Sequence, residues 1–269
     1  MVGIIFVTIT LFEVISSSPE AYRYLGNNIV TMGLLMNTIH QKPLIKFPKK
    51  SSKIENKSFN ISFSNVSFKY RKNYILENLS FEIREKENVL LSGESGSGKT
   101  TIVNLLSRFW EKESGKIKIG NIDLKNFTEQ KLREFIGLIR QESYIFNTTI
   151  KNNLLIGDSN ATEAKLWKTL ESLDLGKFIA SLPKKLDSHV GKRGCFLSQG
   201  QRRRIDLARV LLSKKPIIIL DEPTEHLDSS VEKLVFEAIR EFTRDRTLFM
   251  TSHRGRMNSY IKIDKIINL

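Results

Sequence analysis

Cysteine is nearly absent from the sequence, since Cys195 is the only one among 269 residues. A single cysteine can form neither an intrachain disulfide nor a cysteine-based zinc site. Proline and glycine are also few, at 6 and 15 residues, which excludes a fibrous or low-complexity chain. With 40% hydrophobic and 27% charged residues, the composition is typical of a globular protein in a reducing compartment.

The N-terminal stretch has no cation before Arg23 and no apolar run long enough to span a membrane. Residues 1–12 are apolar, but at about 1.5 Å per helical residue they reach only about 18 Å, against a hydrocarbon core of about 30 Å. A secretory signal peptide needs basic residues before its apolar run, whereas the first charge here is Glu13. We therefore expect neither secretion nor, from this stretch alone, a membrane span.

A second helix, or a kinked continuation of the first, is expected from Ser18. Ser18, Pro19 and Glu20 combine an N-cap hydroxyl, a proline at the first helical position and a carboxylate near the positive helix end. Apolar residues then recur at spacings of three and four up to Ile39, which predicts one apolar stripe that needs a partner. Residues 42–58 contain two prolines and many cations without periodicity, and indicate a linker that ends near residue 58.

A glycine-rich loop follows two stretches of alternating apolar residues, 61–70 and 79–83, which predict half-buried antiparallel strands. The loop connects a short apolar strand, 88–92, to a helical pattern and matches G-x-x-x-x-G-K-[ST]. In this motif, backbone N–H groups and the helix N-terminus face phosphate oxygens, Lys99 neutralises phosphate charge and the Thr100 hydroxyl binds Mg²⁺. The sequence thus predicts a nucleoside triphosphate site, formed by Gly93, Glu94, Ser95, Gly96, Ser97, Gly98, Lys99, Thr100 and Thr101.

Two adjacent carboxylates end a second apolar strand. Four branched apolar residues, 217–220, predict a parallel strand that is buried on both faces and delivers its carboxyl end to the ligand edge of the sheet. Asp221 is then expected near Mg²⁺. Glu222 is expected to polarise the attacking water, an effect worth about 10²–10⁴-fold for a positioned base.

These motifs, in this order, resemble the nucleotide-binding domains of ATP-binding cassette (ABC) transporters. Residues 197–201, Leu-Ser-Gln-Gly-Gln, resemble the L-S-G-G-Q signature of that family. Four single residues also resemble family positions: Tyr70 the aromatic platform under adenine, Gln141 the Q-loop glutamine, Asp228 the D-loop aspartate and His253 the switch histidine.

The resemblance implies a fold and a mechanism. The implied fold is the α/β P-loop NTPase cassette over residues 59–269, with a mixed sheet core and a helical subdomain at about 147–213. Two such domains pair head to tail, so that each ATP lies between the P-loop of one and Ser198, Gly200, Gln201 and Asp228 of the other. The implied activity is an ATPase coupled to transport, using ATP and Mg²⁺, with no nucleic-acid partner. The implied catalytic residues are Glu222, His253, Gln141 and Lys99, and the implied metal ligands are Thr100, Gln141 and Asp221.

Three further segments resemble the export-type branch of the family. Residues 143–153 and 189–194 resemble its P-x-L-F-x-G-T-I-x-x-N and x-V-G-E-x-G segments. Residues 12–26 resemble the end of the last transmembrane helix and its cytosolic extension in thiol-reductant exporters of cytochrome bd assembly, above all their C-type subunit. This implies that residues 1–45 are a remnant of that helix and its extension, residues 46–58 a linker and residues 59–269 the ATPase domain. It also implies a location at the cytoplasmic membrane, with a membrane domain that this chain lacks.

Two residues depart from the family pattern, and two other functions stay open. Gln199 replaces the first signature glycine, which is expected to weaken the ATP contact, and Lys192 replaces a glutamate that couples to the membrane domain. One alternative is a soluble ABC-type ATPase that acts on nucleic acid or the ribosome, which the formal net charge of +14 would suit. The other alternative is a non-functional truncated fragment with an exposed apolar stripe.

Overall fold

The computed structural model describes the chain except for residues 41–42, 44, 51–57, 143, 226 and 253–258, and residues 13–21 by their backbone only. The chain divides into two compact units, Met1–Leu44 and Ile45–Leu269. Each unit is described below by itself.

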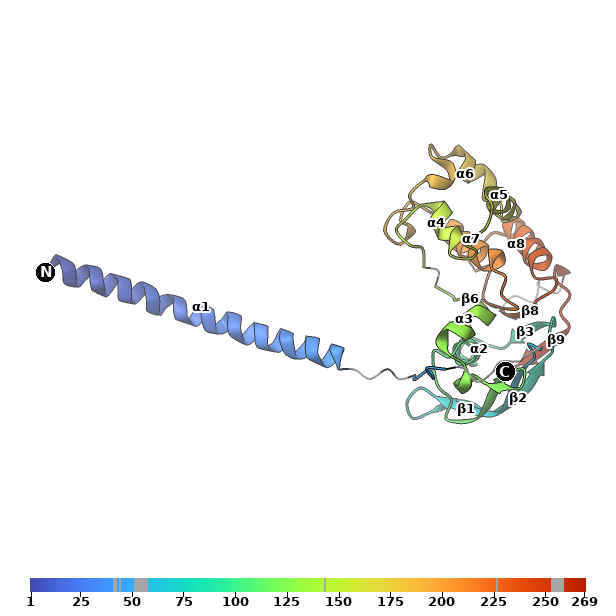
Figure 1. Ribbon diagram of the computed structural model, residues 1–269, viewed down its shortest axis with the longest axis horizontal. Helices are drawn as coiled ribbons and strands as arrows, with labels where there is room; N and C mark the ends of the chain where they lie inside the picture. Colours follow the sequence, from blue (N-terminus) through green and yellow to red (C-terminus); the bar gives the residue numbers. More distant parts are fainter. Residues whose placement is uncertain (41–42, 44, 51–57, 143, 226, 253–258) are drawn as a thin grey trace. The chain divides into compact units, whose positions relative to one another are not determined.

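In the first unit, the structure describes one continuous helix, α1 (Val2–Ile39) (Figure 1). The separate helix start expected at Ser18 is therefore wrong. An N-cap signal is worth only about 1 kcal/mol, and cooperative helix formation on both sides of it continues the helix through such a site. Apolar side chains such as Leu25 and Ile29 are exposed along it. Among the described residues, no helix has both the length and the apolar character needed to cross a membrane.

The second unit contains two sheets. The strands of the five-stranded sheet run parallel in the order β6 (Ile136–Ile139), β7 (Ile217–Asp221), β8 (Thr247–Thr251), β3 (Asn88–Ser92) and β9 (Lys265–Asn268). The strands of the four-stranded sheet run antiparallel in the order β2 (Tyr74–Ile83), β1 (Ile61–Lys69), β4 (Ser114–Ile119) and β5 (Ile122–Asp123). The antiparallel pairing predicted from the alternation at 61–83 is confirmed.

Strand β7 is buried along its whole length, as predicted for a parallel strand covered on both faces. Ile217 and Ile219 face a core shared with β1 and α2, whereas Ile218 and Leu220 face a core shared with α7 and α8. A fully buried side chain of this size contributes about 1.5–3 kcal/mol. The two cores hold the strand rigidly, which fixes the position of the residues at its carboxyl end.

The helices of this unit form two groups. Helices α2 (Lys99–Leu106) and α3 (Glu129–Phe135) contribute apolar side chains to the core next to the antiparallel sheet. The other helices pack together on the opposite side of the parallel sheet (Figure 1): α4 (Ile150–Leu155), α5 (Glu163–Ser172), α6 (Gly176–Ser181), α7 (Gln199–Leu212) and α8 (Ser229–Phe242). Short 3₁₀ turns lie at Leu124–Asn126, Lys185–Asp187 and Lys192–Gly194.

Candidate active site

Four parallel strands end at one edge of the five-stranded sheet and present the predicted motifs there. The P-loop follows β3, Gln141 lies just beyond β6, Asp221 is the last residue of β7 and Thr251 the last of β8. Because parallel strands have their carboxyl ends on the same side, segments that are far apart in the sequence meet at this edge.

The P-loop curls around the ammonium of Lys99. Gly96 and Gly98 have φ angles of 84° and 101°, which glycine adopts without strain. A Cβ on Gly98 would lie 2.9 Å from Leu76 Cδ2, so any side chain at this position would clash. Lys99 Nζ donates to the carbonyl oxygens of Gly93 at 2.8 Å and Glu94 at 2.7 Å. The ammonium is thereby held inside the loop.

Two features of the loop fit a phosphate. The Ser97 hydroxyl is buried and has no hydrogen-bond partner within the described part of the chain. A Cβ on Gly93 would lie only 2.6 Å from Ser97 Oγ, so glycine keeps this space open. Gly98 is the N-cap of α2, whose first N–H groups have no acceptor within the helix. A phosphate oxygen would accept hydrogen bonds from such donors.

Asp221 and Thr100 form an oxygen pair suited to Mg²⁺. The Thr100 hydroxyl donates to Asp221 Oδ2 at 3.3 Å, and the Thr251 hydroxyl donates to Asp221 Oδ1 at 2.6 Å. Hydroxyl and carboxylate oxygens are the hard donors that Mg²⁺ prefers. Gln141 lies outside this cluster: it makes no hydrogen bond to Thr100 or Asp221 in the described structure, and its carbonyl oxygen accepts from Arg203 Nη1 at 3.2 Å.

Glu222 is half-buried and has a left-handed backbone. Its φ of 51° costs a residue other than glycine about 1–2 kcal/mol. The Glu222 N–H donates to Thr251 Oγ1 at 3.1 Å, and the Glu222 carbonyl accepts from Arg203 Nη2 at 2.7 Å. The two peptide groups that flank the Cα of the predicted general base are therefore both held by hydrogen bonds.

Tyr70 lies next to the P-loop within an aromatic cluster. Its hydroxyl is 3.2 Å from Thr101 Oγ1. Its ring makes edge contacts with Phe68 and Trp110, at centroid distances of 4.8 and 5.1 Å. The ring is thus supported by two aromatic neighbours, and 43% of Tyr70 is exposed.

The signature and D-loop residues cap two helices. Ser198 Oγ accepts a hydrogen bond from the Gln201 N–H at 3.2 Å, and Gln201 Oε1 accepts one from the Ser198 N–H at 2.9 Å. These two bonds form a capping box at the start of α7. Gly200 lies in the first turn of this helix. Asp228 caps α8. The pKa of its carboxyl group is lowered mainly by a hydrogen bond from the Ser230 hydroxyl and, to a smaller extent, by one from the Val231 N–H. His253 lies outside the described residues.

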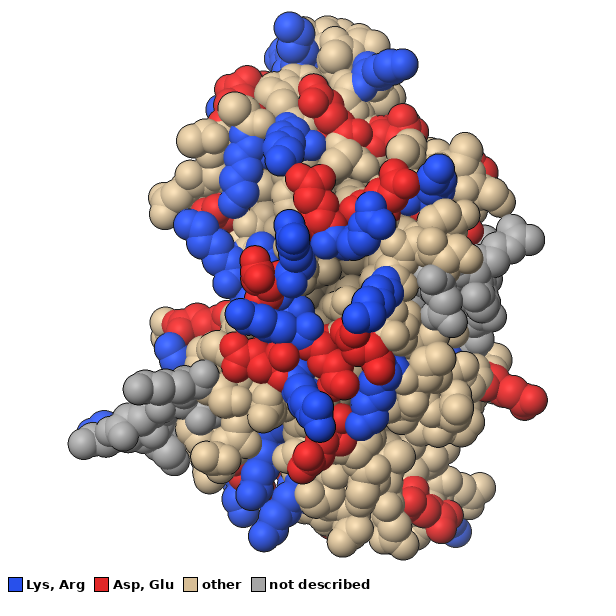
Figure 2. Space-filling view, turned by 90° about the vertical axis from the view of Figure 1, so that its right-hand side faces the viewer, with Lys and Arg blue, Asp and Glu red and all other residues tan. Residues whose placement is uncertain are grey.

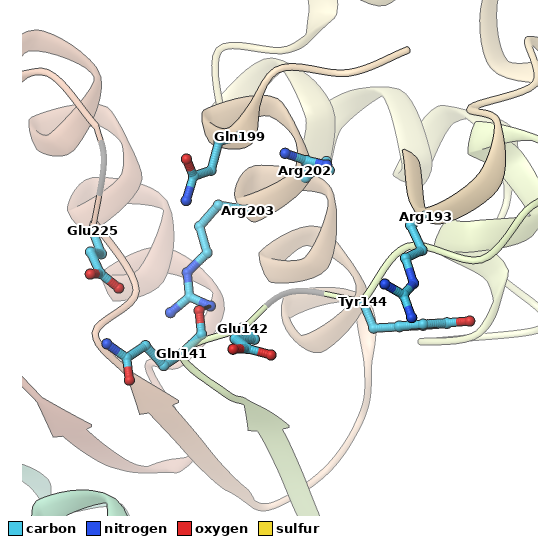
Figure 3. Close-up of a pocket in the computed structure, with 8 residues that line it drawn as sticks. All are labelled: Gln141, Glu142, Tyr144, Arg193, Gln199, Arg202, Arg203 and Glu225. Atoms are coloured by element: carbon cyan, nitrogen blue, oxygen red, sulfur yellow. Dashed lines mark hydrogen bonds between the residues drawn. The ribbon is translucent and has the colours of Figure 1, made fainter. Parts of the chain in front are cut away.

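A cavity of about 620 Å³ separates the start of α7 from the segments after β6 and β7. At this cavity, the side chain of Arg203 extends from α7 toward Gln141 (Figure 3). Burial lowers the pKa of Arg203, and its guanidinium donates to the carbonyl oxygens of Arg140, Gln141, Asp221 and Glu222. Eight residues line the cavity: Gln141, Glu142, Tyr144, Arg193, Gln199, Arg202, Arg203 and Glu225.

Sequence reasoning missed two residues of this site, Arg203 and Thr251. In the sequence, Arg203 is one of three consecutive arginines in a helical pattern, and Thr251 ends an apolar strand. A polar residue at the carboxyl end of a buried parallel strand is a signal that could have identified Thr251. No such signal distinguishes Arg203 from its neighbours.

A model of the ABC transporter family matches residues 76–225, more than half of the chain. The chain belongs to this family. The ABC chain is 37% identical over 209 residues to "Putative multidrug export ATP-binding/permease protein YgaD" of Bacillus subtilis (strain 168). The matched region covers 77% of the chain and 36% of that protein. It is 38% identical over 216 residues to "Putative multidrug export ATP-binding/permease protein SAV1866" of Staphylococcus aureus (strain Mu50 / ATCC 700699). Here the matched region covers 80% of the chain and 37% of that protein.

A solved structure of a bacterial Atm1-family ABC exporter with ATP bound has the same fold. It superposes with a TM-score of 0.82 at 31% identity, over 92% of this chain and 44% of that one. The α/β cassette fold expected from the sequence is thereby confirmed. The ABC chain spans just over a third of the length of the curated relatives described above.

Proposed function

We propose that this ABC chain binds ATP with Mg²⁺ and hydrolyses it, as the nucleotide-binding part of an exporter. The main support is the pairing of the P-loop with a buried carboxylate, in which Thr100 Oγ1 lies 3.3 Å from Asp221 Oδ2 beside the loop that encloses Lys99. A loop rich in N–H donors binds phosphate, and the neighbouring hard oxygen pair binds a divalent cation.

In this proposal, the P-loop binds the triphosphate and Tyr70 stacks on the adenine. Lys99 Nζ exchanges its carbonyl partners, Gly93 and Glu94, for β- and γ-phosphate oxygens. Thr100 and Asp221 would hold Mg²⁺, which would neutralise negative charge on the phosphates when bound. Gln141 lies outside this pair in the described structure, and we propose that it joins them as a ligand when nucleotide binds. The partial exposure of Tyr70 supports this role, because a base can stack only on a ring that it can reach.

Glu222 acts as the general base. It follows Asp221 directly, so it lies at the sheet edge where the phosphates would bind. Its carboxylate accepts the proton of the attacking water, and His253 contacts the γ-phosphate. The loss of a positioned base lowers a hydrolysis rate by about 10²–10⁴-fold.

The second ABC half completes each site. Ser198, Gly200, Gln201 and Asp228 close the ATP that is bound to the partner's P-loop. The N-terminus of α7 supports this role, because its positive end favours an anion by about 0.3–2 kcal/mol. Binding of ATP between two halves shifts them toward the closed dimer, and loss of the products releases them.

The membrane domain belongs to a partner or to a further segment of the protein. The relatives are named as ATP-binding/permease proteins for multidrug export, which supports export at the cytoplasmic membrane with the cassette on the cytoplasmic side. Within this proposal, residues 1–45 are the end of a membrane helix and its extension, residues 46–58 a linker and residues 59–269 the ATPase domain. Thiol export stays a prediction from the resemblance to thiol-reductant exporters.

We propose no nucleic-acid partner. Binding to a polyanion requires a continuous basic surface. Figure 2 shows Lys and Arg interspersed with Asp and Glu over the face turned to the viewer. The positive net charge is not gathered into one patch on that face.

Hydrolysis by a Glu222→Gln variant tests this function. We expect Glu222→Gln to bind ATP with unchanged affinity and to release phosphate at least about 100-fold more slowly, because the general base is lost. The matched control is Glu241→Gln, which removes an exposed carboxylate on α8 and should hydrolyse like the wild type. Equal rates for wild type and Glu222→Gln would overturn the assignment of the base.

A further inference from the structure

Glu222 has a backbone conformation that its side chain does not favour. A φ of 51° places it in the left-handed region, which residues with a Cβ avoid unless their surroundings hold them there. The residue lies directly after β7, where the predicted general base must have a defined position. Hydrogen bonds to the peptide groups on both sides of its Cα hold this conformation.

Thr251 holds the N–H side. It is fully buried, ends β8 and lies opposite Asp221 in the parallel register of β7 and β8. Its hydroxyl accepts from the Glu222 N–H at 3.1 Å and donates its own proton to Asp221 Oδ1 at 2.6 Å. A hydroxyl has one proton to donate and lone pairs to accept with, so the two bonds are compatible and fix its orientation.

Arg203 holds the carbonyl side. Its guanidinium is buried and Nη2 donates to the Glu222 carbonyl at 2.7 Å. Nη1 donates to the Gln141 carbonyl at 3.2 Å, so one planar fork spans the segments after β6 and β7 (Figure 3). Arg203 lies about one turn after the start of α7. Its position therefore depends on that helix.

We propose that Thr251 and Arg203 are positioning residues that clamp Glu222 in its left-handed conformation and thereby fix where its carboxylate can reach. The inference deepens the proposed function and rests on it, because the clamp matters for hydrolysis only if Glu222 is the base. Without the clamp, the backbone of Glu222 relaxes toward the right-handed region and the carboxylate loses its defined position.

Amide hydrogen exchange at Glu222 tests the clamp without any need for activity. In the full chain, Thr251→Val keeps a branched side chain but removes the acceptor, whereas Thr251→Ser keeps the hydroxyl. We expect exchange of the Glu222 amide to be faster by about tenfold in Thr251→Val, the factor expected for one ordinary hydrogen bond, and unchanged in Thr251→Ser. Equal protection in wild type and Thr251→Val would overturn the proposal.

ATP hydrolysis at saturating Mg²⁺ tests the functional consequence. We expect Thr251→Val to lower kcat by about tenfold or more with KM for ATP within about twofold, and Thr251→Ser to retain the wild-type kcat. In a Glu222→Gln background, Thr251→Val should have no further effect, because the clamp acts through Glu222. An equal loss of kcat in both backgrounds would contradict the clamp.

Arg203→Lys gives a second test, at the peptide group that follows Glu222. It keeps the charge but loses the fork, and we expect it to lower kcat in the same direction as Thr251→Val. Thermal unfolding of each variant shows whether it is folded, and Thr251→Val alone decides the matter if Arg203→Lys does not fold. If Glu222→Gln hydrolyses ATP at the wild-type rate, the general base assignment fails, and the exchange measurement still decides the clamp.

Discussion

At the scale of single residues, each carboxylate oxygen of Asp221 accepts a hydrogen bond from one hydroxyl group. Thr251 donates from the end of β8 and Thr100 from the P-loop. The two hydroxyls have different tasks: Thr251 fixes the carboxylate inside the protein, whereas Thr100 is placed to share a cation with it. This division of tasks leads to a prediction about Mg²⁺.

Thr100→Val should raise the Mg²⁺ concentration needed for half-maximal ATP binding by about tenfold, because it removes a hydroxyl ligand while keeping the shape of the side chain. Thr100→Ser keeps the hydroxyl and serves as the matched control. Titration of ATP binding against Mg²⁺ measures the effect. An unchanged Mg²⁺ dependence in Thr100→Val would exclude Thr100 as a ligand.

The sequence predicts the residues of this site better than their contacts. Lys99, Thr100 and Asp221 follow from short motifs in which spacing alone fixes the geometry. Arg203 and Thr251 contact residues about 60 and 30 positions away, and only the packing of α7 and the pairing of β8 with β7 bring them to the site. The left-handed backbone of Glu222 is likewise invisible in the sequence, because glutamate carries no preference for it.

At the scale of secondary structure, the start of α7 combines a stabilising and a proposed binding role. The capping box uses the side chains of Ser198 and Gln201, the same residues that are proposed to meet the partner's ATP. The Ser198 hydroxyl accepts from the Gln201 N–H through a lone pair, so its proton stays available to be donated to a nucleotide phosphate.

Ser198→Ala should lower the free energy of unfolding by about 1 kcal/mol, because it leaves a helix N–H without an acceptor. Urea unfolding without nucleotide measures this loss. Ser159→Ala, at an exposed turn position, is the matched control and should change stability by less than about 0.5 kcal/mol. Equal stability of the Ser198→Ala and Ser159→Ala variants would show that the capping box contributes nothing.

Periodicity predicts strands and long helices well and helix ends poorly. The buried strand at 217–220 is found as predicted, since four branched apolar residues leave few other solutions. Of the two possibilities predicted at Ser18, a separate helix is wrong and a continuation of the first helix is found, because a cap motif is local and α1 continues through it. Element type thus depends on many residues, whereas an element's end depends on one or two.

At the scale of the whole molecule, the chain carries one P-loop and one signature helix, on separate segments of the second unit. The proposed head-to-tail pairing uses the P-loop of one copy and the α7 start of another. Both features are present here, but the segments matched in the curated relatives make up only 36% and 37% of those proteins. Completion of the site by a second half is therefore the main proposal at this scale.

Specific ATPase activity should rise with protein concentration, because each complete site needs two chains. Phosphate release per mole of protein, measured over a hundredfold range of concentration, reports on this directly. Ser198→Ala should flatten the rise, because it weakens the partner's contact with ATP. A constant specific activity across the range would contradict the shared site.

Calorimetric titration of ATP and Mg²⁺ into the purified chain is the most direct test of the central claim, that the loop around Lys99 binds a triphosphate. We predict saturable binding by the wild type and by Lys177→Ala, which removes an exposed lysine of α6, and no binding by Lys99→Ala. Binding heat of equal size in wild type and Lys99→Ala, or none in the wild type, would contradict the account.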